Sequence, residues 1–154
     1  MVGAPVCLCL VPGLRGRMAA LVAHPSKSTK PNRTPAQTIV ITGANSGIGF
    51  DAAQKLAARG HRVYVACRTQ AKADATAQAT GAAGAFECDL SSLASVQRFL
   101  DVWGSKPIDV LCLNAGVAMN TGDKTPKFTQ EGFEETIGVN HFGHFLVAQR
   151  LLGA

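Results

Sequence analysis

A glycine-rich turn at residues 42–49 lies between two segments of different character. Thr38–Thr42 is an unbroken run of β-branched residues, which is typical of a strand buried on both faces of a parallel sheet. Ile48–Arg59, on the other side of the turn, is rich in alanine and is followed by Gly60, a residue type that commonly ends helices. A strand, a tight turn and a helix in this order begin a βαβ unit, so the chain is predicted to build a parallel sheet.

The same alternation continues along the rest of the chain. Further strands are predicted at Arg62–Cys67, Ala85–Cys88 and Ile108–Leu113. Helices are predicted at Ala71–Ala79, from Ser91 or Ser92 onward, and from about Glu131 to the end. Such spacing implies right-handed crossovers and a doubly wound parallel α/β sheet, a Rossmann fold truncated after about four strands. We expect these strands in the order third, second, first, fourth.

Residues 1–36 differ from residues 37–154, which hold all the predicted elements. This leader contains five of the seven prolines and five basic residues, whereas the first acid of the chain is Asp51. Ten basic and ten acidic residues balance from Thr38 onward, so the net charge of +5 belongs to the leader. A nucleic-acid-binding protein would need a basic face on the fold itself, so that class is set aside. The leader is predicted to be a disordered or targeting segment, dispensable for folding.

The cysteines and the apolar runs exclude other classes. The five cysteines show neither a zinc-binding pattern nor the density of a secreted disulfide framework. Cys67, Cys88 and Cys112 each end an apolar run and are expected to be buried, reduced thiols. The longest apolar run, at Val6–Val11, is far shorter than the roughly 20 residues of a transmembrane helix, so none is expected.

The glycines of residues 42–49 follow the spacing G-x-x-x-G-x-G. Gly43 permits a tight turn, Gly47 lets the backbone approach a pyrophosphate, and Gly49 allows the helix to pack closely on the strand. Ser46, Gly47 and Ile48 open the helix, whose unpaired first-turn amides and positive dipole end would face the phosphates. Between a strand and a helix, this motif predicts a phosphate-binding turn.

Four motifs together resemble the short-chain dehydrogenase/reductase family, in its N-terminal part only. They are Thr42–Gly49, Asp89-Leu90, Asn114-Ala115-Gly116, and Asn140 within residues 139–145. Ala66-Cys67-Arg68 and residues 140–145 are especially similar to the branch that contains retinol dehydrogenases and light-dependent protochlorophyllide reductases. The resemblance implies NADP(H)-dependent hydride transfer to or from a carbonyl, an alcohol or a conjugated double bond, with a small, apolar molecule as substrate.

Arg68 determines the expected cofactor. In folds of this kind an acid ending the second strand accepts from the ribose 2′-OH of NAD, whereas a nearby Arg accommodates the 2′-phosphate of NADP. Here the second strand ends in Cys67, Arg68 follows, and no acid occurs before Asp74. A guanidinium without a carboxylate at Cys67 favours NADP. The alternative is an Arg68 that merely faces solvent at a strand end.

Five residues after the third and fourth strands complete the predicted cofactor site. By resemblance, Asp89 and Leu90 flank the adenine ring, and the Asp89 carboxylate accepts from its amino group. Asp89 could also interact favourably with the dipole of the following helix, which is compatible with that role. Asn114, Ala115 and Gly116 end the fourth strand at the carboxyl edge of the sheet, where open α/β sheets bind ligands.

Asn140 is unusual inside a helix, because its side chain competes with backbone bonding. The resemblance implies that it distorts the helix and holds a water that leads to the catalytic lysine, a supporting role; the alternative is a helical Asn without a role. His141 and His144 lie three residues apart, nominally on one helix face. No carboxylate or Cys completes a metal site with them, so both are expected to pack structurally.

The acid–base centre that the resemblance implies is absent from this sequence. That centre is a Tyr followed four residues later by a Lys, whereas the single tyrosine here, Tyr64, is followed at that distance by Arg68. Three hypotheses remain: an incomplete copy of an NADP-dependent reductase, a non-catalytic NADP-binding module, or a fragment that does not fold stably. Whether the 154-residue chain is an enzyme by itself is therefore open.

Two further expectations follow from the strand order and from the leader. A chain that stops after Ala154 would leave the strand Ile108–Leu113 as an open, apolar edge, which favours self-association. The apolar residues of the last helix exceed one buried stripe and act in the same direction. If the leader is a transit peptide, the resemblance makes chloroplast the expected organelle rather than mitochondrion; otherwise the protein is expected in the cytoplasm.

Overall fold

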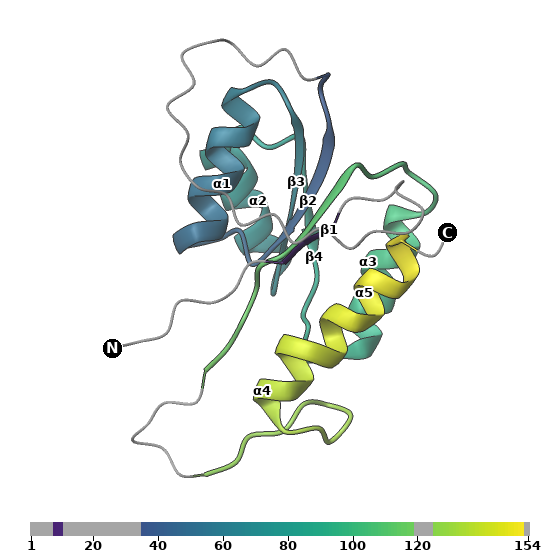
Figure 1. Ribbon diagram of the computed structural model, residues 1–154. Coiled ribbons are helices and arrows are strands. Elements are labelled where there is room, and N and C mark those ends of the chain that lie inside the picture. Colours follow the sequence, from purple (N-terminus) through teal and green to yellow (C-terminus); the bar gives the residue numbers. More distant parts are fainter. Residues whose placement is uncertain (1–7, 11–34, 119–124, 153–154) are drawn as a thin grey trace.

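The computed structural model describes residues 8–10, 35–118 and 125–152, and its centre is a five-stranded sheet (Figure 1). The strands lie in the order β1-β5-β2-β3-β4. Their bounds are Leu8–Leu10 for β1, Thr38–Thr42 for β2, Arg62–Cys67 for β3, Gly84–Glu87 for β4 and Val110–Leu113 for β5. The four strands from β2 to β5 are parallel and follow the predicted order.

Helices cover both faces of this sheet, as expected of a doubly wound fold. Figure 1 shows α1 (Gly47–Ala58) and α2 (Gln70–Thr80) on one face and α3 (Leu93–Trp103) and α5 (His144–Leu152) on the other. Two buried clusters fill the layers between sheet and helices. The β2 side chains alternate between them, with Val40 in one cluster and Ile39 and Ile41 in the other. The predicted α/β architecture is therefore confirmed.

An aromatic group anchors the cluster between the sheet and α3. The ring of Tyr64 meets that of Trp103 edge-on, with centroids 5.1 Å apart, and Phe86 lies against Phe99 and Trp103 at 5.5 and 5.6 Å. Edge-to-face pairs at such distances stabilise a core beyond the area that they bury. The only tyrosine of the chain thus has a packing role.

Side-chain bonds shift two predicted boundaries. β5 begins at Val110 rather than Ile108, after Asp109, whose carboxylate accepts from the Thr38 amide at 2.7 Å. The last helix begins at Glu135 rather than about Glu131, as α4 (Glu135–Ile137), and the carboxylate of Glu134 caps it by accepting from two of its amides. These amide bonds also lower the pKa of the Glu134 carboxyl group.

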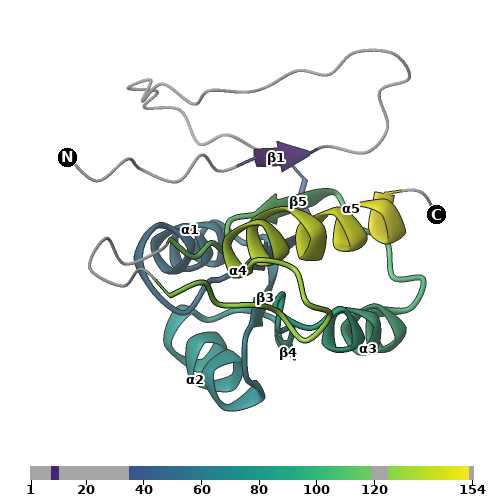
Figure 2. The same ribbon diagram turned by 90° about the horizontal axis from the view of Figure 1, so that it is seen from below.

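The leader supplies a strand that its sequence did not reveal. β1 pairs with β5 in antiparallel register, from Leu8 opposite Leu113 to Leu10 opposite Leu111, and Figure 2 shows it beside β5. The expectation that Ile108–Leu113 forms an open edge is therefore wrong, because β5 pairs with β2 on one side and with β1 on the other. Unpaired backbone groups at a sheet edge bind any suitable extended segment, and part of the Val6–Val11 run takes this place.

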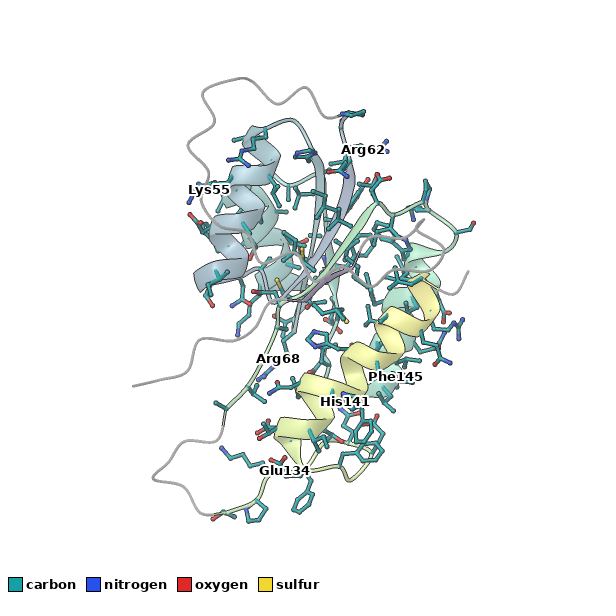
Figure 3. All side chains as sticks on the ribbon, in the orientation of Figure 1. Lys55, Arg62, Arg68, Glu134, His141 and Phe145 are labelled. Atoms are coloured by element: carbon teal, nitrogen blue, oxygen red, sulfur yellow. The ribbon has the colours of Figure 1, made fainter. Side chains whose placement is uncertain are left out.

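The C-terminal part of the chain, from Phe133 through α5, keeps apolar side chains at the surface, as expected. Phe133, Ile137 and Phe145 are exposed, and Figure 3 shows Phe145 pointing away from the sheet. Leu146, Leu151 and Leu152 instead pack partly against the core. Among the described helices, none has the length and hydropathy needed to cross a lipid bilayer.

The pairing of β1 with β5 can be tested by removing residues 1–36. The core clusters of the described residues are built from residues 39–152, so we expect the shortened protein to fold, with a thermal midpoint only a few degrees lower. Amides of β5 should exchange with deuterium faster, because one side of this strand loses its partner. Amides of β3, which keeps both neighbours, are the internal control. Unchanged exchange in β5 would contradict the pairing, and a loss of many degrees would contradict dispensability.

Candidate functional site

The turn between β2 and α1 uses its glycines in different ways. Gly43 has a positive φ of 66°, and a Cβ at this position would lie 2.6 Å from the Cα of Ala115. Gly47 also has a positive φ, of 57°, in open space. Gly49 is buried, and a Cβ there would collide with the amide of Asn114 and lie 2.7 Å from the carbonyl oxygen of Gly43. Two glycines thus shape the turn, and the third brings α1 against it.

The N-terminus of α1 leaves its first amides without a side-chain cap. Ser46 occupies the N-cap position in an extended conformation, and its side chain makes no capping bond. The first helical turn has amides that lack intrahelical partners and carry the positive end of the dipole. Gly47 and Ile48, in this turn, line a cavity at the carboxyl edge of the sheet. This arrangement can accept an anionic group such as a phosphate.

Thr42 and Asn114 fasten the ends of β2 and β5 together. The hydroxyl oxygen of Thr42 accepts hydrogen bonds from the backbone amides of Asn114, at 3.0 Å, and Ala115, at 3.1 Å. In the other direction, the side-chain amide of Asn114 donates to the carbonyl oxygens of Thr42, at 3.0 Å, and Gly43, at 3.2 Å. The side chain of Asn114 therefore holds the turn in place, a role that sequence analysis did not assign to it.

The cavity measures about 830 Å³, within the range of small-molecule and cofactor sites. Of the predicted site residues, only Gly49 lies outside its wall; the cavity is lined by Gly43, Ser46, Gly47, Ile48, Arg68, Asp89, Leu90, Asn114, Ala115, Gly116 and Asn140. The tertiary structure thus brings residues from four strand ends and three helices into one site. The lining residues to which sequence analysis assigned no individual role are Thr42, Asn45, Ala66, Lys72, Cys88, Val117, Ala118 and Val139. Most of them are chain neighbours of predicted residues, which was the available signal.

Two cations and one carboxylate are among the residues that line this cavity. Arg68 follows β3, its side chain is 55% exposed, and its Nε lies 4.0 Å from Asp89 Oδ1 (Figure 3). The same Asp89 oxygen accepts from the amide and the hydroxyl of Ser91, at 3.0 and 2.7 Å, which fixes the carboxylate. Lys72, in the first turn of α2, lines the cavity as well. A pair this long and exposed contributes little stability, so Arg68 can turn toward an anionic ligand.

Asn140 lies in a π-helix, η1 (Gly138–Gly143), between α4 and α5. Its side chain accepts from the amide of Val117 and donates to the carbonyl oxygen of the same residue, both at 2.8 Å. Gly143 packs so closely on Leu90 that a Cβ would lie 2.7 Å from the Leu90 carbonyl oxygen. The helix distortion implied by the resemblance is therefore present, and such wide turns are frequent at functional sites.

His141 and His144 do not share a helix face, contrary to the expectation. His144 is buried, whereas His141 is exposed and stacks on Phe145. Figure 3 shows His141 and Phe145 on the side of the helix away from the sheet. A π-helix has a wider turn than an α-helix, so residues three apart diverge in direction. His144 Nε2 lies 2.9 Å from the hydroxyl of Thr42, and its Nδ1 lies 3.3 Å from the carbonyl oxygen of Asn140. Burial lowers the pKa of His144, and the bond to Asn140 raises it less.

Cys67, Cys88 and Cys112 are buried thiols, as predicted. Burial is the main cause that raises the pKa of Cys67, and burial together with the neighbouring Asp89 raises that of Cys88 to about 12. The thiolate is the nucleophilic form, so a thiol held protonated is unreactive near neutral pH. Cys88 therefore lines the cavity as an apolar group.

The contact between Gly43 and Ala115 can be tested with Gly43→Ala and Gly81→Ala. Both positions have similar φ angles, 66° and 71°, but the new methyl group would meet nothing within 4 Å at position 81. We expect Gly81→Ala to cost about 1–2 kcal/mol, the penalty of the left-handed conformation. Gly43→Ala should cost clearly more, because the collision with Ala115 is added. Urea unfolding measures both losses, and equal values would show that the turn has room.

The lowered pKa of His144 predicts a pH-dependent stability. The unfolded chain protonates this histidine near its ordinary pKa of about 6.5, whereas the folded protein does so only at lower pH. The stability that the folded protein gains from neutral His144 is therefore complete above about pH 6.5, the unfolded pKa. It is lost as the pH falls from there through the folded pKa. The slope from this single proton is at most about 1.4 kcal/mol per pH unit. Unfolding between pH 7.5 and 5 should show a smaller loss for His144→Gln than for wild type or His141→Gln; identical losses would refute it.

Known proteins match both the sequence and this arrangement. The family model of the short chain dehydrogenase matches residues 37–154. A chloroplastic protochlorophyllide reductase from Chlamydomonas reinhardtii is 43% identical over 152 residues, covering 87% of this chain and 38% of that protein. A short-chain dehydrogenase from Sphingobium yanoikuyae in complex with NADPH superposes with a TM-score of 0.61 at 29% identity, covering 75% of this chain and 46% of that one. The 3-ketoacyl-(acyl-carrier-protein) reductase from Brucella melitensis complexed with NADH gives 0.62 at 30% identity, with coverages of 76% and 49%.

This chain corresponds to only part of the length of each of these relatives. The chain spans little more than a third of the protochlorophyllide reductase and less than half of each solved structure. The residues that the family model matches, 37–154, contain the four parallel strands, the glycine turn and the residues that line the cavity. With a family match over more than half of its length, the chain belongs to the short-chain dehydrogenase family.

Proposed function

We propose that this chain binds NADP(H) in the cavity at the carboxyl edge of its sheet, as the nucleotide-binding portion of an oxidoreductase. The observation that carries this proposal is the convergence of the glycine turn, the uncapped start of α1 and two cations on one cavity. Uncapped amides bind phosphate oxygens, and nearby cations add charge-assisted bonds. The cofactor itself, when bound, supplies or accepts a hydride at its nicotinamide ring.

The residues present fit the parts of a dinucleotide. The amides of Gly47 and Ile48 would hold the pyrophosphate, which the open space beside Gly47 admits. Asp89 and Leu90 would flank the adenine, and the bonds from Ser91 leave the Asp89 carboxylate fixed in position. The segment that starts at Asn114 would meet the ribose next to the nicotinamide.

Preference for NADP(H) over NAD(H) is proposed from charge. β3 ends in the buried Cys67, so no carboxylate at this position repels a 2′-phosphate or accepts from a free 2′-OH. Arg68, directly after β3, and Lys72, in the first turn of α2, supply two positive charges to the cavity wall. The related structures include one complex with NADPH and one with NADH, so they do not favour either cofactor. The proposed preference therefore depends on the local charges.

Hydride transfer to a carbonyl, an alcohol or a conjugated double bond is proposed for the whole protein of which this sequence would be part. The sequence contains no Tyr-x-x-x-Lys, and Tyr64 is packed against Trp103. Asn140 would support such a centre by positioning, because its side chain holds Val117 at the cavity wall. The substrate is proposed to be small and apolar, and the chloroplast is the proposed location, after the similar plant and algal proteins.

A non-catalytic NADP(H)-binding module is the second candidate. One observation favours it: the described cavity wall contains neither a tyrosine nor a histidine, and the sequence contains no Tyr-x-x-x-Lys. Binding of NADPH without turnover by the 154-residue chain would support this candidate. Turnover with a carbonyl substrate would exclude it.

The cofactor preference can be tested by titrating NADPH and NADH into wild type, Arg68→Ala and Lys55→Ala. Loss of a charge-assisted bond to the 2′-phosphate costs about 1.5–3 kcal/mol, so Arg68→Ala should bind NADPH roughly 10–100-fold more weakly. NADH binding should change little, because NADH lacks this phosphate. Lys55, on the exposed face of α1 and away from Arg68 in Figure 3, is the control, and its variant should behave as wild type. Equal wild-type affinities for both cofactors would refute the preference.

A further inference from the structure

We propose that His144 is a positioning residue, held as the neutral Nδ1–H tautomer, which links η1 to the glycine turn through the hydroxyl of Thr42. The proposal deepens the one above and rests on it where it predicts an effect on NADPH binding. The link joins three parts of the chain that are far apart in sequence. It consists of the Asn140 carbonyl, the His144 ring and the Thr42 hydroxyl, which in turn receives two amides of the cavity wall.

Hydrogen-bond counting at Thr42 determines the tautomer. A hydroxyl has two acceptor positions and one proton to donate. The amides of Asn114 and Ala115 occupy both acceptor positions, at 3.0 and 3.1 Å. The proton can go to His144 Nε2, at 2.9 Å, or to the carbonyl oxygen of Cys112, at 3.4 Å. A protonated Nε2 would bring three donors to two acceptor positions, so Nε2 is the acceptor and the hydroxyl donates to it.

The other ring nitrogen is consistent with this assignment. In the neutral ring one nitrogen carries the proton when the other accepts. Nδ1 therefore carries it and donates to the carbonyl oxygen of Asn140, which lies 3.3 Å away and can only accept. Both ring nitrogens then have a partner, as a buried polar side chain requires. The opposite tautomer would leave Nδ1 and this carbonyl as two acceptors facing each other.

The link gives η1 a second hold on the segment that lines the cavity after β5. The first hold is the Asn140 side chain, which bonds both backbone groups of Val117. The second passes through His144 and Thr42 to Asn114 and Ala115. Residues 114–117 are thus held at both ends. We therefore expect their position relative to the glycine turn to depend on His144 Nε2, which accepts from the Thr42 hydroxyl. Loss of that acceptor should weaken NADPH binding more than it weakens the fold.

Nitrogen NMR of the histidine rings tests the tautomer without any cofactor. In the 154-residue protein labelled with ¹⁵N-histidine, we expect a protonated Nδ1 and an unprotonated Nε2 for His144 at pH 7.5, and His144→Gln identifies its signals. His61 is an internal reference of the opposite kind, because its Nδ1 accepts from the amide of Gln37 and its proton must lie on Nε2. A protonated Nε2 on His144 would overturn the proposal.

Two substitutions separate the two bonds of the ring. In His144→Gln, the side-chain amide oxygen can take the place of Nε2 and accept from the Thr42 hydroxyl. In His144→Asn, the shorter side chain places its amide nitrogen near the position of Nδ1, and the acceptor for Thr42 is lost. We expect His144→Gln to bind NADPH within about threefold of wild type and His144→Asn about tenfold more weakly, the effect of one buried hydrogen bond. Exposed His141→Asn is the matched control and should leave the affinity unchanged. Equal affinities of the Gln and Asn variants would reduce His144 to packing and overturn the proposal.

Failure of cofactor binding and failure of this proposal give different results. If wild type binds no NADPH, the proposed function fails, but the ring nitrogens and the amides of Asn114 and Ala115 still report the link. In that case His144→Asn should speed hydrogen exchange of these two amides several-fold more than His144→Gln does. Equal exchange rates in both variants would overturn the proposal whatever the cofactor result.

Discussion

The hydroxyl of Thr42 is the group on which the arrangement of the site depends. It stands at the end of β2, the strand between β3 and β5, and it is buried. Where two parallel strands end side by side, the next backbone groups have no hydrogen-bond partner in the sheet. If such a group is buried, it needs another hydrogen-bond partner. Thr42 accepts two such amides from the end of β5 and bonds His144 on the helical layer. One side chain thereby joins the sheet, the cavity wall and η1.

Close packing around this group explains why small residues surround it. The turn at Gly43 approaches Ala115 so closely that no side chain fits between them, and Gly143 lies against Leu90 in the same way. Arg68 and Asp89 form a long ion pair of 4.0 Å at the cavity wall. A cation that is held so weakly is able to bind an anionic group of a ligand instead.

Much of the fold and of the site could be predicted because local signals were consistent. The β-branched run of Thr38–Thr42, the glycine spacing that follows and the cap of Ser92 each favoured one local structure, and the structure has all three. What failed depended on partners distant in sequence. β1 has only three residues and no alternating pattern, so its pairing with β5 depends on the free edge that it meets. The different directions of His141 and His144 depend on a π-helix, for which a single sequence offers no periodic signal.

The sequence by itself determined the order of the elements, the location of the turn and the residue types at the strand ends. These are properties of short segments, in which periodicity, glycine and capping residues act on the nearest backbone. Only the tertiary structure decided which of these residues meet. It placed Lys72 beside the predicted site, used the Asn114 side chain to hold the turn, and buried His144 against Thr42, 102 positions away in the chain. Contacts of this kind arise because polar groups that packing removes from water must find partners, wherever the chain supplies them.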